Sequence, residues 1–189
     1  MRFSRCLGAI TLAFSTHVAA INCPSPDNLV TNCGFDVGIA GYQAQDGDVI
    51  GHDAALGSTA PGAMLVIDTL SDADSQAEAE LCIDLDAQTN YHIGADVLGE
   101  DANQCFLGWD EYLQPGCVQT NGVFSPTDTL PVTATAFTTV DGLLRTSAEV
   151  QSVELVIVCE GDGSVPTRFA VDDVFVLPGP LFVDGFESD

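Results

Sequence analysis

The amino-acid sequence predicts an all-β fold, an antiparallel β-sandwich of the jelly-roll type. Three observations predict it. Short runs alternate between apolar and polar residues, turn signals such as Asp-Gly and Pro-Gly separate these runs, and no segment carries a convincing helical period. A period of two places one face of a strand on a core and the other face outward. About eight such strands in one chain are typical of a sandwich.

The expected strands cover residues 28–31, 64–69, 77–85, 91–98, 105–112, 134–140, 152–159 and 169–177. The alternation is clearest at 91–97, where odd-numbered positions are apolar and even-numbered positions are polar or small. The runs around Leu81 and Leu155 alternate in the same way. We expect segment 71–80, SDADSQAEAE, to be a loop that leads into a strand. Turn signals lie at 46–47, 61–62, 115–116, 121–122, 141–142 and 161–163.

The first twenty residues have the pattern of a secretory signal peptide. Arg2 and Arg5 form a positive start, residues 7–14 are apolar but too short to span a bilayer, and small residues at 18–20 offer a cleavage site. We therefore expect a secreted protein, extracellular or alternatively periplasmic. The predicted organisation is a signal peptide over residues 1–20, one β-sandwich domain over 21–178 and a C-terminal tail over 179–189.

The charge excludes several functions. The chain has 28 acidic residues, four arginines, no lysine and a formal charge of −24 at pH 7. Hydrophobic residues make up 46% of it, so it is not a disordered acidic segment. Without lysine it lacks the residue that a Walker-A phosphate loop, a Schiff-base enzyme or a Ser-x-x-Lys acyltransferase requires. A field this negative repels phosphate backbones, so we expect no nucleic-acid partner. We also expect no membrane span.

Six cysteines remain once the signal peptide is removed, and an even number in a secreted chain predicts disulfides. Cys105 and Cys117 flank a hairpin-like segment, so we expect them to pair. Cys82 and Cys159 each lie on a long alternating strand, which favours a bridge between those strands.

The remaining two cysteines, Cys23 and Cys33, are expected to clamp the N-terminal turn. A zinc site is the weaker alternative for the cysteines. No Cys-x-x-Cys occurs in the sequence, and the chain without its signal peptide keeps only His52 and His92.

Both ends of the predicted domain resemble carbohydrate-binding modules of the family 4/9 type, which are galactose-binding-like jelly rolls. Residues 28–36, NLVTNCGFD, are similar to the opening motif NLV-x-NGGFE of these modules, and residues 169–176, FAVDDVFV, resemble their last strand. Between them, residues 58–67 and 89–97 resemble two internal strands. The resemblance covers about residues 28–177 and implies the same fold and a carbohydrate ligand.

The sequence departs from this family pattern at two places. The opening motif usually continues into a tryptophan, but Gly41-Tyr42 stands there, which weakens any stacking role. Cys33 replaces the first glycine of NGG, so we expect a disulfide to constrain this turn. Residues 181–189 are separately similar to an F-x-DGFES ending of secreted proteins from some Gram-negative bacteria; the alternative is a ragged end or an edge strand.

The resemblance also implies a structural calcium ion, because modules of this type commonly hold one near the N-terminal turn and the last strand. The matching side chains are Asp36 and Asp172. Hard cations bind several carboxylate and carbonyl oxygens, which both segments supply. The alternative to a calcium site is that these aspartates are near each other by chance, because so acidic a chain places aspartates near every loop.

A glycan site needs aromatic planes for the apolar faces of sugars and polar side chains for their hydroxyls. The strand at 105–112 holds the only tryptophan, Trp109, and also Tyr112. Strict alternation puts them on opposite faces, so a bulge must re-aim one if both join a single platform. His92 and Asp96 share the outward face of a strand that we expect to be its neighbour. The predicted site for a neutral glycan comprises these four residues, unless Trp109 is a core residue.

An enzyme is a less favoured interpretation. A glycoside hydrolase needs two carboxylates about 5–10 Å apart, and alternation points Asp110 and Glu111 to opposite faces. The Gly-x-Ser-x-Gly motif of serine hydrolases is missing from the sequence. The strongest alternative to glycan binding is a structural or adhesive protein without a sugar site, because one scaffold serves many functions.

Overall fold

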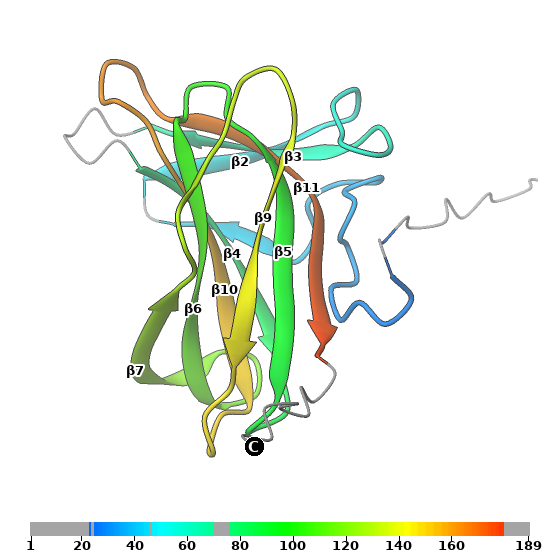
Figure 1. The fold of residues 1–189 in the computed structure, drawn as a ribbon, viewed down its shortest axis with the longest axis vertical. Coiled ribbons are helices and arrows are strands. Elements are labelled where there is room, and N and C mark those ends of the chain that lie inside the picture. Colours follow the sequence, from blue (N-terminus) through cyan, green and yellow to red (C-terminus); the bar gives the residue numbers. More distant parts are fainter. Residues whose placement is uncertain (1–22, 24, 46, 70–75, 180–189) are drawn as a thin grey trace, which may run out of the picture.

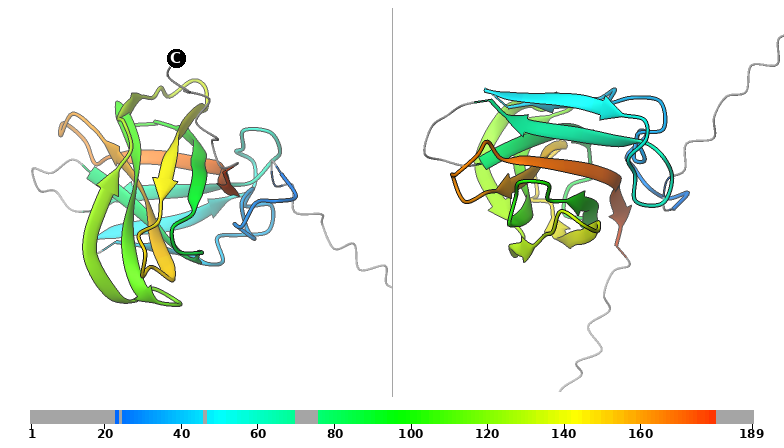
Figure 2. Two further views of the ribbon diagram at one scale, coloured as in Figure 1. Left: turned by 60° about the horizontal axis from the view of Figure 1, so that its bottom comes forward. Right: turned by 90° about the horizontal axis from the view of Figure 1, so that it is seen from above.

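The computed structural model describes residues 23, 25–45, 47–69 and 76–179. These residues form strands, turns and loops and contain no helix, which confirms the all-β prediction. Two antiparallel sheets pack face to face as a sandwich (Figure 1; Figure 2). The predicted signal peptide and the tail from residue 180 onward lie outside the described residues. The described part of the chain holds no helix long and apolar enough to cross a membrane.

Sheet A has six strands, in the order β1-β4-β10-β6-β7, with β8 also paired to β6. Their bounds are Tyr42–Ala44 for β1, Gln76–Asp84 for β4, Ser152–Glu160 for β10, Gln104–Gln114 for β6, Val118–Pro126 for β7 and Leu130–Pro131 for β8. The long strands β4 and β6 flank β10 on either side, so β10 is the central strand of this sheet.

Sheet B has five strands, in the order β2-β3-β11-β5-β9. Their bounds are Asp48–Asp53 for β2, Ala63–Asp68 for β3, Arg168–Pro178 for β11, Asn90–Leu98 for β5 and Thr138–Arg145 for β9. The β5 and β6 strands, which follow each other along the chain, therefore lie in opposite sheets. The expectation that they are neighbours in one sheet was wrong.

The core lies between the two sheets and follows the alternation in the sequence. Ile93 and Val97 of β5 are fully buried, as are Leu107 of β6 and Leu155 of β10. The alternation of apolar and polar residues along each of these strands thus decides which side chains are buried between the sheets. At about 25 cal/mol per Å², burial of each such aliphatic side chain contributes roughly 1.5–3 kcal/mol.

Four strands, β1, β2, β7 and β8, were missed because their apolar residues do not alternate. The strand β7 is an edge strand whose side chains are all exposed or half-buried, so backbone pairing with β6 holds it. Its Asn121-Gly122 pair, which the sequence marks as a turn, lies within the strand. The strand predicted at 134–140 is shifted to β9, because the expected turn glycine Gly142 lies opposite Ile93 in the middle of a ladder.

The segment predicted as a first strand, residues 28–31, contains a bend and the start of a turn and does not form a ladder. Residues 28–33 lie beside the second half of β11, where the N–H of Leu29 donates to the carbonyl of Val176 at 3.0 Å. The side chain of Asn28 makes two further bonds to this strand. Its Nδ2 donates to the carbonyl of Val174 (2.9 Å), and its Oδ1 accepts from the N–H of Val176 (2.9 Å). A side chain thus replaces part of the backbone pairing.

Three disulfides are present, and one of them has the predicted partners. The Cys23–Cys33 bridge is confirmed. The predicted Cys105–Cys117 pairing was wrong, because Cys105 bonds to Cys159. These two residues are directly opposite each other in the β6–β10 ladder and both are fully buried. Two cysteines that face each other on neighbouring antiparallel strands are close enough to bridge.

The predicted Cys82–Cys159 pairing was wrong for a related reason. Cys82 lies on the outer face of β4, whereas Cys159 points into the core, so the two side chains lie on opposite sides of sheet A. Cys82 bonds instead to Cys117, in the turn between β6 and β7. This turn reaches across β10, where the N–H of Cys117 donates to Oγ of Ser152 at 3.0 Å.

The exposure of the bridges predicts the order in which they open. We expect a mild reductant to open Cys82–Cys117 first, because Cys82 is exposed while Cys105 and Cys159 are fully buried. Alkylation after graded reduction, followed by peptide mapping, measures this order. Labelling of Cys105 or Cys159 before Cys82 would show that the core opens before the surface bridge.

Candidate functional site

The four residues predicted to bind a glycan lie in three separate places. Trp109 is in the core, Tyr112 is on the outer face of sheet A, and His92 and Asp96 are on the outer face of sheet B. The structure therefore does not bring them into one site. The two faces are on opposite sides of the sandwich, with the core between them.

Trp109 is a core residue, so the predicted stacking role was wrong. Only 7% of its surface is exposed, and it packs in the main hydrophobic cluster. The alternation of β6 explains this. Cys105, Leu107 and Trp109 point inward together, and no bulge in β6 turns the indole outward. Large aromatic side chains contribute most when they are buried in this way.

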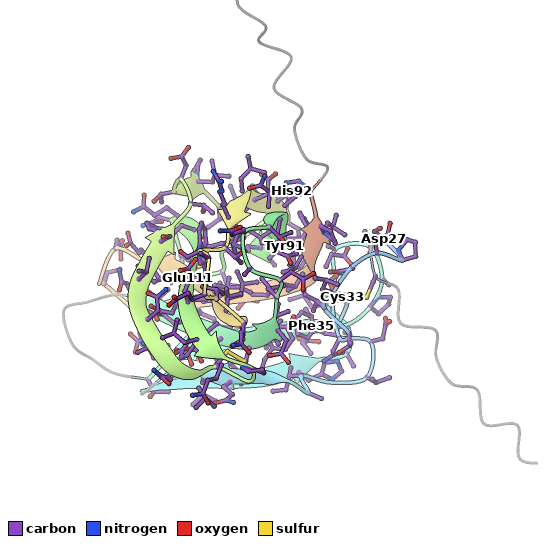
Figure 3. The ribbon with its side chains drawn as sticks, turned by 90° about the horizontal axis from the view of Figure 1, so that it is seen from below. Asp27, Cys33, Phe35, Tyr91, His92 and Glu111 are labelled. Carbon is purple, nitrogen blue, oxygen red and sulfur yellow. A yellow bond between two sulfur atoms is a disulfide. The ribbon has the colours of Figure 1, made fainter. Side chains whose placement is uncertain are left out.

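His92 and Asp96 share one face of β5, as predicted, but each already has a partner. The His92 ring lies 2.6 Å from Oδ2 of Asp141, and its edge contacts the ring of Phe175. Asp96 accepts hydrogen bonds from the hydroxyls of Ser58 and Thr139. In Figure 3, seen from below, His92 lies at the rim of the molecule. This face offers fewer free polar groups than the sequence indicates.

Tyr112 lies on the outer face of sheet A beside several carboxylates. Its hydroxyl donates to Oε2 of Glu154 at 2.6 Å. This hydrogen bond raises the pKa of Tyr112, and the negative charges of Asp110 and Glu80 raise it further. The phenol therefore stays protonated. Tyr112 provides one face of an aromatic ring at the centre of an acidic surface.

A second aromatic ring on this face was missed by sequence reasoning. Phe124 of β7 is 49% exposed, and its ring lies against Gly108 of β6, where a Cβ atom would overlap it. Next to Gly108 across the ladder, Val156 of β10 is buried although it points outward. A glycine in the middle of an alternating strand is the signal that could have indicated close approach of another group.

We call the resulting surface the sheet A face. It comprises Glu80, Gly108, Asp110, Tyr112, Phe124, Glu154 and Val156. The turn that carries Cys117 limits it at one end, because the N–H of Gly116 donates to Oδ1 of Asp84 (2.8 Å) across the sheet. The sheet A face therefore combines two aromatic rings, an apolar strip and three carboxylates.

The sheet A face is strongly anionic. Desolvation raises the pKa of Asp110, and the neighbouring charge of Glu154 raises it further. The arginines in the described part of the chain, Arg145 and Arg168, are on β9 and β11 of sheet B. Of the carboxylates of the sheet A face, that of Glu154 accepts the hydrogen bond from the Tyr112 hydroxyl.

Glu111 and Asp110 point to opposite faces of β6, as predicted, and Glu111 is the one that points into the sandwich. It is 2% exposed and is labelled in Figure 3. Its carboxylate accepts from Nδ2 of Asn121 (2.9 Å) and from the N–H (3.0 Å) and hydroxyl (2.6 Å) of Ser147. These bonds tie β6, β7 and the loop before β10 together, as expected of a buried carboxylate with donors on every side.

Asp172, one of the two predicted calcium ligands, holds the loop between β2 and β3 against sheet B. It is 1% exposed, and its two oxygens accept from the N–H of Ser58 (2.6 Å) and of Asp173 (2.8 Å). Asp173 in turn accepts from the hydroxyl of Thr59 (2.7 Å) and lies close enough to Asp36 to feel its charge. Burial raises the pKa of Asp172 to about 6.

This cluster does not have the arrangement of a cation site. Among the described residues, no group of three or more histidine, cysteine, aspartate or glutamate side chains is placed to hold a metal ion. Both oxygens of Asp172 are already acceptors for backbone N–H groups. The calcium ion that the family resemblance implies at Asp36 and Asp172 stays a prediction.

Comparison with known proteins identifies relatives by structure alone. No protein-family model and no curated protein sequence matches the chain. The family 22 carbohydrate-binding module joined to a family 10 catalytic module in Clostridium thermocellum endo-1,4-β-xylanase 10B, complexed with xylohexaose, is similar with a TM-score of 0.66 and 16% identity. The match covers 82% of this chain and 29% of that chain.

Two isolated modules are also similar. One is a family 22 xylan-binding domain from Paenibacillus barcinonensis, with a TM-score of 0.60, 12% identity and coverage of 78% of this chain and 98% of that chain. The other is a family 61 module in complex with β-1,4-galactotriose, with a TM-score of 0.53, 16% identity and coverage of 80% and 99%. These likenesses show the jelly-roll fold of carbohydrate-binding modules.

The acidic clusters predict how stability depends on pH. Burial raises the pKa of five carboxyl groups, those of Asp48, Glu78, Asp110, Asp172 and Asp173. A carboxyl group with a raised pKa binds its proton more tightly when the protein is folded. Its stabilising effect is complete below the unfolded pKa of about 4 and is lost as the pH rises through the folded value. Urea unfolding between pH 4 and pH 7.5 should therefore show stability falling as pH rises.

The substitution Asp172→Asn should reduce the fall in stability between pH 4 and pH 7.5 by up to about 3 kcal/mol, because burial raises the pKa of Asp172 to about 6. The matched control is Asp162→Asn, since hydrogen bonds from Ser164 lower the pKa of Asp162. This control should not flatten the slope. A wild-type stability that rises between pH 4 and pH 6.5 would contradict the assignment.

Proposed function

We propose that the protein is a secreted, non-catalytic carbohydrate-binding protein whose site is the sheet A face. The observation that carries the proposal is the pairing of Tyr112 and Phe124 with carboxylates on one face of a sandwich. The fold, shared with modules that bind xylohexaose and β-1,4-galactotriose, supports it. Three disulfides are compatible with an oxidising, extracellular location.

The chemistry of the sheet A face suits a sugar ring. Aromatic planes at Phe124 and Tyr112 accept the apolar C–H face of a pyranose, while Asp110 and Glu154 accept hydrogen bonds from its hydroxyls. Carboxylate acceptors strengthen such bonds relative to neutral ones. With two rings instead of a long aromatic row, we expect a short glycan.

The charge of the sheet A face selects against acidic glycans. The arginines of the described residues, Arg145 and Arg168, are on strands of sheet B, and the whole chain carries −24. A uronic-acid polymer would bring further negative charge to this surface and be repelled. The ligand is therefore a neutral or a basic glycan.

The arrangement of carboxylates supports a binding role without catalysis. Asp110 and Glu111 point to opposite faces of β6, and the hydrogen bonds of Glu111 hold the interior together. A glycoside hydrolase needs two carboxylates that face one sugar from the same space. Asp110 and Glu111 are therefore not a catalytic pair, and the proposal of binding without catalysis is supported by the structural similarity to carbohydrate-binding modules.

Calorimetric titration with xylohexaose and β-1,4-galactotriose tests the proposal. The substitution Phe124→Ala should weaken binding about tenfold, because it removes one stacking ring. Gly108→Ala should weaken it similarly, since the new Cβ displaces the Phe124 ring. Trp109 is not used as a binding probe, because its loss would open a core cavity.

Sheet B supplies a matched control for the glycine substitution. Gly94→Ala displaces the ring of Phe175 in the same way on the other face, and it should leave affinity unchanged. Leu143→Ala removes an exposed apolar side chain from sheet B and should also have no effect. If neither neutral glycans nor amino-sugar oligomers bind wild type, the structural or adhesive alternative replaces the proposal.

A further inference from the structure

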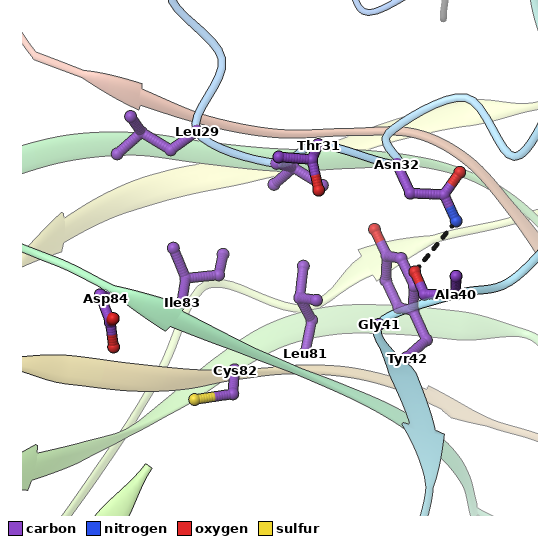
Figure 4. Close-up of a pocket in the computed structure, with 11 residues that line it drawn as sticks. Leu29, Thr31, Asn32, Ala40, Gly41, Tyr42, Leu81, Cys82, Ile83 and Asp84 are labelled. Carbon is purple, nitrogen blue, oxygen red and sulfur yellow. Dashed lines mark hydrogen bonds between the residues drawn. The ribbon is translucent and has the colours of Figure 1, made fainter. Parts of the chain in front are cut away.

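The two edges of sheet A are covered differently. At one edge the short strand β1 pairs with residues 79–81 of β4 and leaves a pocket of about 340 Å³ beside Tyr42 (Figure 4). The Tyr42 hydroxyl is fully buried, so a ligand in this pocket cannot reach it. At the other edge the longer strand β7 covers β6, and its side chains are exposed or half-buried. The polar groups of β7, unlike this hydroxyl, are therefore open to solvent.

A bulge interrupts β7 at the Asn121-Gly122 pair. The ladder between β6 and β7 shifts register there, so that residues 121–123 of β7 lie opposite the single residue Glu111 of β6. Extra residues on one strand of an antiparallel pair leave the regular ladder. Gly122 has a φ of +76°, which glycine adopts without the strain that a side chain would cause. The bulge therefore depends on a glycine directly after Asn121.

This bulge directs the Asn121 amide at the buried carboxylate of Glu111. The Nδ2 atom of Asn121 donates to Oε2 of Glu111 at 2.9 Å. The hydroxyl of Ser147 donates to the same oxygen, and its N–H donates to Oε1. A buried charge is tolerated only when hydrogen bonds compensate for the water that it has lost. Asn121 therefore supplies one of the donors that hold Glu111 inside the sandwich and β7 against it.

Asn-Gly is also the dipeptide in which an asparagine amide is least protected from its own backbone. The backbone nitrogen after an asparagine lies close to the Cγ atom of its side chain, and a glycine there has no Cβ atom to hinder the approach. Gly122 is exposed, the space beside it is open, and its N–H donates to Oγ1 of Thr120 at 3.0 Å. Water and base therefore reach the atoms that would react.

We propose that Asn121 is a site of spontaneous deamidation, which converts the hydrogen-bond donor of Glu111 into a second carboxylate. The nitrogen of Gly122 forms a bond to Cγ of Asn121, the bond from Cγ to Nδ2 breaks, and ammonia leaves with the proton of the Gly122 nitrogen. Water then opens the cyclic imide at either of its two carbonyl groups, which gives aspartate or isoaspartate. The reaction consumes water and needs no oxidant, reductant or enzyme.

Either product places negative charge against the buried Glu111 carboxylate. The contact that joined a donor to an acceptor becomes a repulsion between two acceptors, and the interior offers Glu111 no water to screen it. The isoaspartate product also routes the main chain through Cβ and Cγ, which lengthens it inside the bulge. We expect β7 to separate from β6 at this point and to move Phe124 away from Gly108. This consequence does not depend on glycan binding.

Peptide mapping by mass spectrometry after incubation of the folded protein in warm, mildly alkaline buffer tests the site. The peptide that contains Asn121 should gain the mass difference between NH₂ and OH about tenfold faster than the peptide that contains Asn103. Asn103 is the internal control, because it is exposed at a bend but precedes a glutamine. Fragmentation should locate isoaspartate at position 121. The variant Asn121→Gln, which keeps the amide, should stay unmodified. Equal rates at the two asparagines would overturn the proposal.

Urea unfolding of a second pair of variants tests the consequence. Asn121→Asp installs the aspartate product directly and should lower the folding equilibrium constant about tenfold to a hundredfold, the effect of losing a hydrogen bond to a charged group. Glu111→Gln combined with Asn121→Asp exchanges donor and acceptor and should recover most of this loss. Wild-type stability in Asn121→Asp would overturn the proposal. So would a double variant no more stable than Asn121→Asp, because the loss would then not come from the two facing carboxylates.

Discussion

The register between β6 and β10 is the constraint on which the surface of sheet A depends. Cys105 and Cys159 face each other in this ladder and are joined inside the core. With the register fixed, the side chains of β6 alternate between the two faces of the sheet, so Trp109 is buried in the core and Tyr112 lies half-buried on the outer face. A slip of one residue would exchange the two faces. The disulfide therefore protects the position of the proposed site as well as the stability of the fold.

Acidic residues have two different tasks in this molecule. Where donors surround a carboxylate, as at Glu111 and Asp172, it joins loops and strands that share no backbone ladder. Where donors are few, as at Asp110 on the sheet A face, partial burial and the charge of Glu154 raise the pKa of the carboxyl group. Some of the carboxylates thus stabilise the sandwich, and others make its surface acidic. The stabilising carboxylates named here act through hydrogen bonds.

Sequence reasoning succeeded where a local pattern carried the information. The alternation around Ile93 and Leu155 predicted strands, their inward faces and the sandwich, and the structure confirms these. It failed where partners come from far along the chain. Phe124 belongs to an edge strand without alternation, and its position over Gly108 follows only from pairing with β6. The same limit explains why Cys82 received the wrong partner.

The sequence by itself determined the fold class and the inward faces of the strands β4, β5 and β10. Each of these depends on composition or on neighbours within a few residues. Only the tertiary structure decided that β5 and β6 lie in opposite sheets, which separates His92 from Tyr112, and that a short β1 leaves a pocket beside Tyr42. Long-range packing decides the order of the strands in each sheet and which strand edges are covered. The alternation of apolar and polar residues does not depend on that order, so the sequence pattern cannot reveal it.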